Sequence, residues 1–278
     1  MRLHVWCGFQ PSQAGIPQGF SIDPECIALQ LLISAHELPI EVVSDSNLLV
    51  CGSLPALVDD TKVIAGFIEI VHHLASRGLL MTSAEDTAQQ FLASRLSTLS
   101  SYLLFEVPKN YVELTRPTIS RSVRFPMQYN LTVGLQRIAK VQCESQGLFP
   151  SRTIKVNSDR EKGLNATHRK MLQQQHSRQA ALKQTQMISH FIARASTFYD
   201  EISLDNLVPN GPAFCLIAAN VAVQSLDIPE AVLVPELLKR PDLSAMADWV
   251  RTVNPIVTVE RSYTLANYLW SVLGYATK

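Results

Sequence analysis

The chain has 278 residues, of which 47% are hydrophobic and 17% are charged, and its formal net charge is zero. This length allows two modest domains, each with its own hydrophobic core. The charged fraction is below the roughly 25% of average soluble domains, so more of the surface is expected to be apolar or neutral. The balanced net charge gives no indication of nucleic-acid or membrane binding.

The cysteines are odd in number, scattered and never spaced as CxxC, which indicates reduced thiols rather than a disulfide framework or a zinc site. They are Cys7, Cys26, Cys51, Cys143 and Cys215. The chain starts directly with a strand-like run, without a signal or targeting pattern before it. Its longest apolar stretches, residues 214–223 and 265–275, fall short of the ~20 residues that span a bilayer. We therefore expect a soluble chain, or one attached to a membrane through other proteins.

The first third of the chain alternates strands and helices. We expect strands at residues 3–6, 40–43, 56–58 and 62–64, and helices at residues 23–36 and 66–75. Asp23, Pro24 and Glu25 form a strong helix start, with an N-cap acid, a proline at the first helical position and an acid in the first turn. This order predicts one small α/β layer that ends in a hairpin and a helix.

From Ser83 onward the pattern is helical only. Ser83 and Asp86 resemble a capping box, and an apolar stripe follows through Phe91, Leu92, Leu96, Leu99 and Leu103. Further helices are expected at residues 127–143, 167–199, 213–225, 233–239 and 243–252. In the long helix at 167–199, an apolar stripe appears only in the second half, through Leu182, Ile188, Phe191, Ile192 and Ala195. We therefore expect its polar first half to project from the core.

The segment that begins at Ser53-Leu54-Pro55 and continues through Val63-Ile64-Ala65-Gly66-Phe67 resembles the part of glutathione transferases with a cis-proline, a hairpin and a helix. The resemblance implies a thioredoxin-like domain at residues 1–80. It also implies an all-helical domain at residues 83–278. Within that domain, residues 147–163 are polar and basic without periodicity, a composition that predicts an exposed loop. The expected fold class is therefore α/β plus all-α, of the glutathione-transferase type.

In the transferases an acid and a serine open the helix after the hairpin and hold the glutathione. Gly66 and Phe67 stand at these positions, and neither side chain can bind an amino or carboxylate group. Cys7 lies where the enzymes carry their activating residue, but no helix start or cation follows it closely. We expect Cys7 to be a buried bystander, and we expect no catalytic residue, cofactor or metal site.

Finer features resemble metaxin-type proteins. They are the opening Leu3-His4-Val5-Trp6, the run Ser21-Ile22-Asp23-Pro24-Glu25-Cys26, the run Phe125-Pro126-Met127-Gln128-Tyr129-Asn130, and the closing helices at 213–250. Within that family, the chain is most similar to the fungal branch, whose members are subunits of the mitochondrial sorting and assembly machinery.

The resemblance implies a non-catalytic subunit on the cytosolic face of the mitochondrial outer membrane that supports insertion of β-barrel precursors. The implied partners are a membrane-embedded β-barrel subunit, a second metaxin-like subunit, a translocase receptor and the precursors themselves. The chain would be peripheral to the membrane and would not bind nucleic acid.

The zero net charge conceals a basic region. Residues 109–194 contain fifteen of the 24 basic residues but only four acids. This region is either a solvated face or a docking surface for an acidic segment or anionic lipid headgroups. Candidate partner-binding residues in it are Arg116, Arg121, Arg124, Arg152, Lys155, Arg169 and Lys170.

Two other functions remain open at this point. One is a divergent transferase-like enzyme that uses Cys7, which would show a reactive thiol and retention on glutathione. The other is a transferase-like scaffold of a cytosolic complex, which would not associate with mitochondria.

Overall fold

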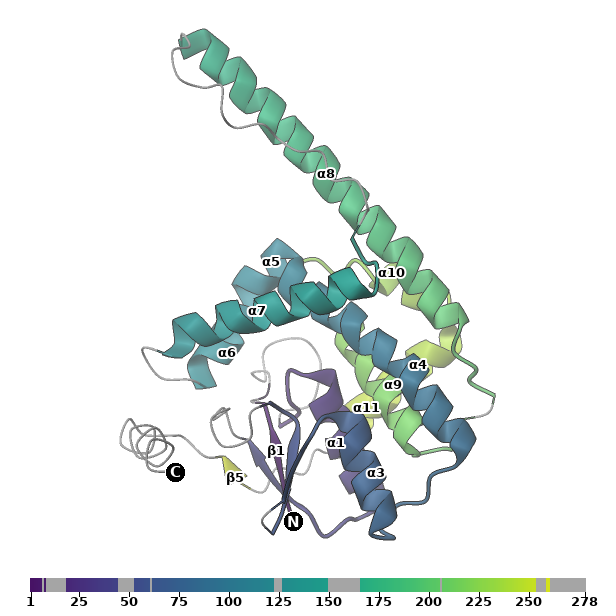
Figure 1. Cartoon of the computed structure of the whole chain (residues 1–278). Coiled ribbons are helices and arrows are strands. Elements are labelled where there is room, and N and C mark those ends of the chain that lie inside the picture. The colour runs from purple at the N-terminus through teal and green to yellow at the C-terminus, as the bar shows by residue number, and fades with distance from the viewer. Residues whose placement is uncertain are drawn as a thin grey trace.

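The computed structural model describes residues 1–6, 8, 19–44, 53–60, 62–122, 127–149, 166–205, 207–253 and 259–260. Within helices and strands, the side chains of residues 121–122, 127–130, 166–177, 180 and 259–260 are not described. The chain is a mixed α/β protein with a small sheet at one end and a larger group of helices beside it (Figure 1).

The sheet has the strand order β4-β3-β1-β2-β5. Strand β1 is parallel to β2 and antiparallel to β3, and β3 is antiparallel to β4. The strands are β1 (Arg2–Val5), β2 (Glu41–Ser44), β3 (Ala56–Asp59), β4 (Lys62–Ala65) and β5 (Val259–Glu260). The first four strands confirm the predicted positions to within two residues. Strand β5 was not predicted; it lies parallel to β2 and adds a short edge strand from the far end of the chain.

Helix α1 (Pro24–Ala35) connects β1 to β2, and α3 (Phe67–Ser76) follows β4. The predicted start of α1 is confirmed, because the Asp23 carboxylate accepts a hydrogen bond of 2.9 Å from the Cys26 N–H. Nine of the twelve residues of α1 are buried. This burial is explained by its position, because α1 contacts both α3 and the distant helix α9 (Pro212–Gln224).

The middle of the chain forms an irregular helical run. Its elements are α4 (Ala84–Ser101), η1 (Tyr102–Glu106), α5 (Pro108–Asn110), η2 (Tyr111–Thr115) and α6 (Arg116–Ser122). The predicted cap of α4 is confirmed, because Ser83 Oγ accepts the Asp86 N–H at 3.0 Å. Segments η1 and η2 are π-helical turns, a rare geometry in which hydrogen bonds join residues five apart.

The remaining helices are α7 (Met127–Ser145), α8 (Ala166–Asp200), α9, α10 (Val234–Leu237) and α11 (Pro241–Thr252). Helix α9 is central, because it contacts α1, α4 and α11. One continuous cluster of buried apolar side chains runs from the sheet through α1 and α9 to α4 and α11. Sheet and helices therefore share a core.

Two predicted apolar stripes are partly wrong. Phe91 is 57% exposed, because α4 turns Ala93, Leu96 and Leu99 inward instead. Leu182 is 62% exposed, because the first half of α8 extends away from the other described helices (Figure 1). Phe191 and Ala195 are fully buried, as the second half of that stripe predicts.

Candidate functional site

The amino terminus of α3 is the position that the resemblance to glutathione transferases assigns to glutathione recognition. Gly66 is its N-cap, with φ of 89°, and it provides no side chain to the helix. The Leu54–Pro55 bond before β3 is cis, and the Gly66 N–H donates to the Pro55 carbonyl at 3.0 Å. Phe67 is only 2% exposed, so its ring is part of the core rather than of a ligand site.

A carboxylate of the chain itself lies at this helix terminus. Glu25 Oε2 accepts a hydrogen bond from the Phe67 N–H at 3.4 Å. The N–H groups at a helix start carry partial positive charge and attract anions. Because Glu25 already accepts from one of them, that donor is occupied, and an external carboxylate would have to displace this side chain.

Burial also shifts the pKa values of Glu25 and Asp23 in the corner between the start of α1 and the start of α3. The pKa of Glu25 is raised to about 7, mainly by desolvation and also by the nearby charge of Asp23, while the Phe67 N–H opposes the rise. Desolvation likewise raises the pKa of Asp23, against hydrogen bonds from Cys26 and Glu25. Two neighbouring carboxyl groups therefore lie at the start of α1, and Glu25 also reaches α3, where a cation would be needed to bind an anionic peptide.

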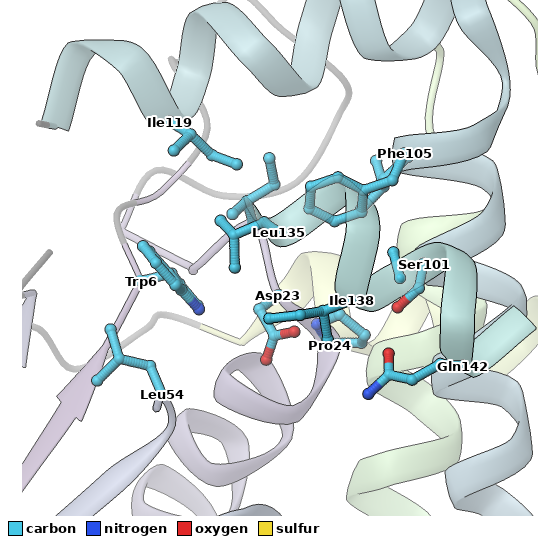
Figure 2. A pocket seen from close by; sticks show the side chains of 13 residues that line it. Trp6, Asp23, Pro24, Leu54, Ser101, Phe105, Ile119, Leu135, Ile138 and Gln142 are labelled. Atoms are coloured by element: carbon cyan, nitrogen blue, oxygen red, sulfur yellow. The ribbon is translucent and has the colours of Figure 1, made fainter. Parts of the chain in front are cut away.

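A pocket opens beside this corner, between the end of the sheet and the helices (Figure 2). Trp6 follows β1, Leu54 precedes β3 and Asp23 opens α1, while Phe105 of η1 and Leu135 of α7 face them. The other lining residues are Ile22, Pro24, Ser101, Leu104, Ile119, Ile138, Ala139 and Gln142.

The chemistry of this pocket favours an apolar occupant. Asp23 is the one ionisable side chain among its described lining residues, and that residue already caps α1. A glutathione-like ligand has two carboxylates, which require bases or amide donors. The lining instead offers aliphatic and aromatic side chains with two neutral polar groups, Ser101 and Gln142.

The cysteines of the described part are buried thiols. Burial raises the pKa of Cys143 to about 12, and it raises the pKa of Cys26 and Cys215 well above the ordinary value of a thiol. A reactive cysteine requires a lowered pKa and access to solvent. Cys7, the candidate of the enzyme hypothesis, lies outside the described residues, as does Cys51.

The predicted basic residues lie on separate elements. Arg116 is exposed at the start of α6, and Arg121 follows on the same helix. Arg169 and Lys170 lie near the outer end of α8, which Figure 1 shows well away from α6. Arg124, Arg152 and Lys155, and most of the predicted loop at 147–163, lie outside the described residues.

Other bases join Arg116 in the middle of the molecule. Lys109 on α5, and Arg137 and Lys140 on α7, are exposed, and α6 packs on α7. No described residues form a cluster that could hold a metal ion. In the same part of the chain, none of the helices is both long and apolar enough to cross a bilayer.

Sequence reasoning missed the pairing of Glu25 with α3. Asp23 and Glu25 were interpreted only as parts of a helix start, and they serve α1 in that way. Their spacing of two residues near Pro24 does not show that Glu25 turns towards a helix more than forty positions away. That contact follows from the packing of α1 on α3.

A comparison with known families places part of the chain in context. Residues 26–136 match the model of the Tom37 family, described as an outer mitochondrial membrane transport complex protein. The matched segment runs from α1 to the first half of α7 and includes Gly66 and Phe67. A search of curated proteins found no match. The predicted resemblance to this metaxin-like family is confirmed over that segment.

Proposed function

We propose, from the family match over residues 26–136, that this chain is a non-catalytic subunit of the mitochondrial outer-membrane sorting and assembly complex. In this role it supports insertion and release of β-barrel precursors and couples the complex to a translocase receptor. The match to a family of outer mitochondrial membrane transport complex proteins is the observation on which this proposal rests.

The sheet topology supports the finer assignment to a glutathione-transferase-like fold. A β1-α1-β2 unit with parallel strands precedes a β3-β4 hairpin and α3, and the order β4-β3-β1-β2 is the thioredoxin-like arrangement. We assign residues 1–80 to this thioredoxin-like domain and residues 83–278 to a helical domain. The short strand β5 would return from the second domain to the first.

The corner at Glu25 and Phe67 supports a non-catalytic role. An aromatic core residue and an internal carboxylate lie where the transferases bind the tripeptide. In that role the fold would provide surfaces that bind other proteins and would not catalyse a reaction.

The basic surface is the proposed contact with protein partners. Arg116, Lys109, Arg137 and Lys140 are exposed on neighbouring elements, and only Glu113 and Glu144 are exposed acids among the described residues of α5 to α7. Acidic segments of a partner would be attracted to this region. The partners would be a membrane-embedded β-barrel subunit and a second metaxin-like chain, with this chain peripheral on the cytosolic face of the membrane.

A pull-down from mitochondria tests the proposal. The tagged chain is extracted in mild detergent, and the retained proteins are identified by mass spectrometry. The expected result is a β-barrel protein and a second metaxin-like chain in stoichiometric amounts. Recovery of the chain alone, or its absence from the mitochondrial fraction, would refute the proposed function.

A charge-reversal pair locates the contact within the chain. Arg116→Glu with Arg137→Glu should reduce partner recovery severalfold, because both side chains are exposed in the basic region. Lys239→Glu is the control, since Lys239 is an exposed base after α10 and lies outside the basic region at residues 109–194. Glutathione resin in parallel tests the enzyme alternative, which predicts retention that a Cys7→Ser change abolishes.

A further inference from the structure

The mouth of the apolar pocket is open. Ile138 lines the pocket from α7 and is nevertheless 57% exposed. Val141, one turn further along α7, is 65% exposed. Contiguous exposed apolar side chains beside an apolar pocket are typical of a surface that another segment covers. The described part of the chain does not cover these two residues.

The carboxyl end of β5 lies at the same end of the sheet as this pocket. Glu260 pairs with Ser44, and Ser44 pairs with Val5, so these residues lie at the same level of three parallel strands. Trp6, the next residue after Val5, lines the pocket. Neighbouring strands are about 4.8 Å apart, which places Glu260 roughly 10 Å from Val5.

The residues after Glu260 have a composition that fits the pocket. Residues 261–278 lie outside the described residues, and their only charged side chains are Arg261 and Lys278. Each of the residues Leu265, Tyr268, Leu269, Val272, Leu273 and Tyr275 stands three or four positions from another member of this set, while Trp270 falls outside the stripe. This pattern predicts one apolar face, and such a face requires a partner surface.

We propose that residues 261–278 of this chain bind in the groove between α7 and the carboxyl end of β1, and thereby cover Ile138. Extended backbone spans about 3.3 Å per residue, so three residues after Glu260 suffice to reach Trp6. The uncharged stretch 262–277 matches a lining whose described residues include no base and a single acid, Asp23. The attachment through β5 holds this segment at an effective concentration of the order of millimolar, so a weak intrinsic affinity is sufficient.

Site-specific photo-crosslinking of the purified full chain tests this assignment. The variant Ile138→p-benzoylphenylalanine places the reactive ketone at the pocket mouth. Trypsin cuts after Arg261 and releases residues 262–278 as one peptide, which mass spectrometry identifies. The expected result is a crosslink between α7 and this peptide in a species of monomer mass. The matched control is Leu238→p-benzoylphenylalanine, because Leu238 is 70% exposed beside α10 and does not line the pocket.

Each other outcome overturns the proposal. A crosslinked dimer identifies a second copy as the occupant, and an adduct with a co-purified chain identifies a partner protein. Crosslinks confined to other parts of the monomer, or none above the Leu238 control, mean that the segment does not bind there.

Hydrogen exchange gives an independent test, in a variant whose substitutions lie outside the residues that line the pocket. In the variant Leu269→Ser with Leu273→Ser, amides of residues 135–142 should exchange about tenfold faster than in the wild-type chain, while those of α9 should not change. Equal exchange in both chains contradicts the proposal. Because both experiments use the isolated chain, their result is independent of the proposed assembly function.

Discussion

Asn110 links two distant parts of the helical group through one fully buried side chain. Its Nδ2 donates to the Leu103 carbonyl at 3.1 Å and to the Glu230 carbonyl at 3.0 Å. Its Oδ1 accepts the Glu230 N–H at 2.8 Å. Asn110 therefore connects the π-helical turn η1 to the segment between α9 and α10, across 120 positions of sequence.

The variant Asn110→Ala removes all three hydrogen bonds and leaves three backbone groups without their partner. A net hydrogen bond contributes about 1 kcal/mol, and a buried group left unsatisfied costs about 1–3 kcal/mol. We expect the free energy of unfolding to fall by about 3 kcal/mol. For a chain of this size that corresponds to a melting temperature about 6–12 °C lower.

Urea unfolding followed by circular dichroism and by tryptophan fluorescence measures this loss. The slope of the transition should be unchanged, because the surface exposed on unfolding is the same. Gln186→Ala, at an exposed position of α8, is the control and should change stability by less than about 0.5 kcal/mol. A loss below about 1 kcal/mol for Asn110→Ala would show that the three hydrogen bonds do not fix this junction.

Three further predictions concern Glu25, which is half-buried, and the buried residues Gln224 and Cys143. The raised pKa of Glu25, about 7, means that folding favours its protonated form. The stability that this protonated side chain contributes is complete at a pH below its ordinary pKa of 4.5, and it is lost as the pH rises through 7. Glu25→Gln should therefore gain stability relative to wild type between pH 5 and pH 8 in urea titrations, and a constant difference would contradict the assigned cause. Gln224 is buried and hydrogen-bonded to Tyr199, Ser100 and the Leu96 carbonyl, so Gln224→Ala should cost about 2–4 kcal/mol, measured by the same unfolding. Cys143, with its pKa raised to about 12, should resist a thiol reagent at pH 8 until urea unfolds the chain; labelling of Cys143 in the folded protein would refute its burial.

Local sequence signals were sufficient to predict where a helix begins when the helix has a clear N-cap residue. Asp23 and Ser83 accept the predicted backbone N–H groups, because N-capping depends on only three or four neighbouring residues. The run from Leu104 to Ser122 was not assigned to a predicted helix. Pro108 and Pro117 interrupt its periodicity, and two π-helical turns shift the face of the helix.

At the candidate site, the sequence predicted only that side chains able to bind glutathione are absent. Gly66 and Phe67 could be recognised as unsuitable for glutathione from their side chains alone. The carboxylate of Glu25 at α3, the apolar pocket beside it and the hydrogen bonds of Asn110 depend on contacts between segments far apart in sequence. Strand β5 is two residues long, which is too short for a periodicity to indicate it.

Helix α8 has a mechanical consequence for anything bound near its outer end. Phe191 is the first buried residue along its described side chains, and Ala166 lies 25 residues before it, a distance of roughly 38 Å. A tilt of about 10° at Phe191 would move that end by roughly 6–7 Å, by the geometry of a rigid helix of this length. The ring of Tyr102 stacks on Phe191 at 4.1 Å. A small repacking of these two rings would therefore displace the outer end of α8 by more than the rise of one helical turn.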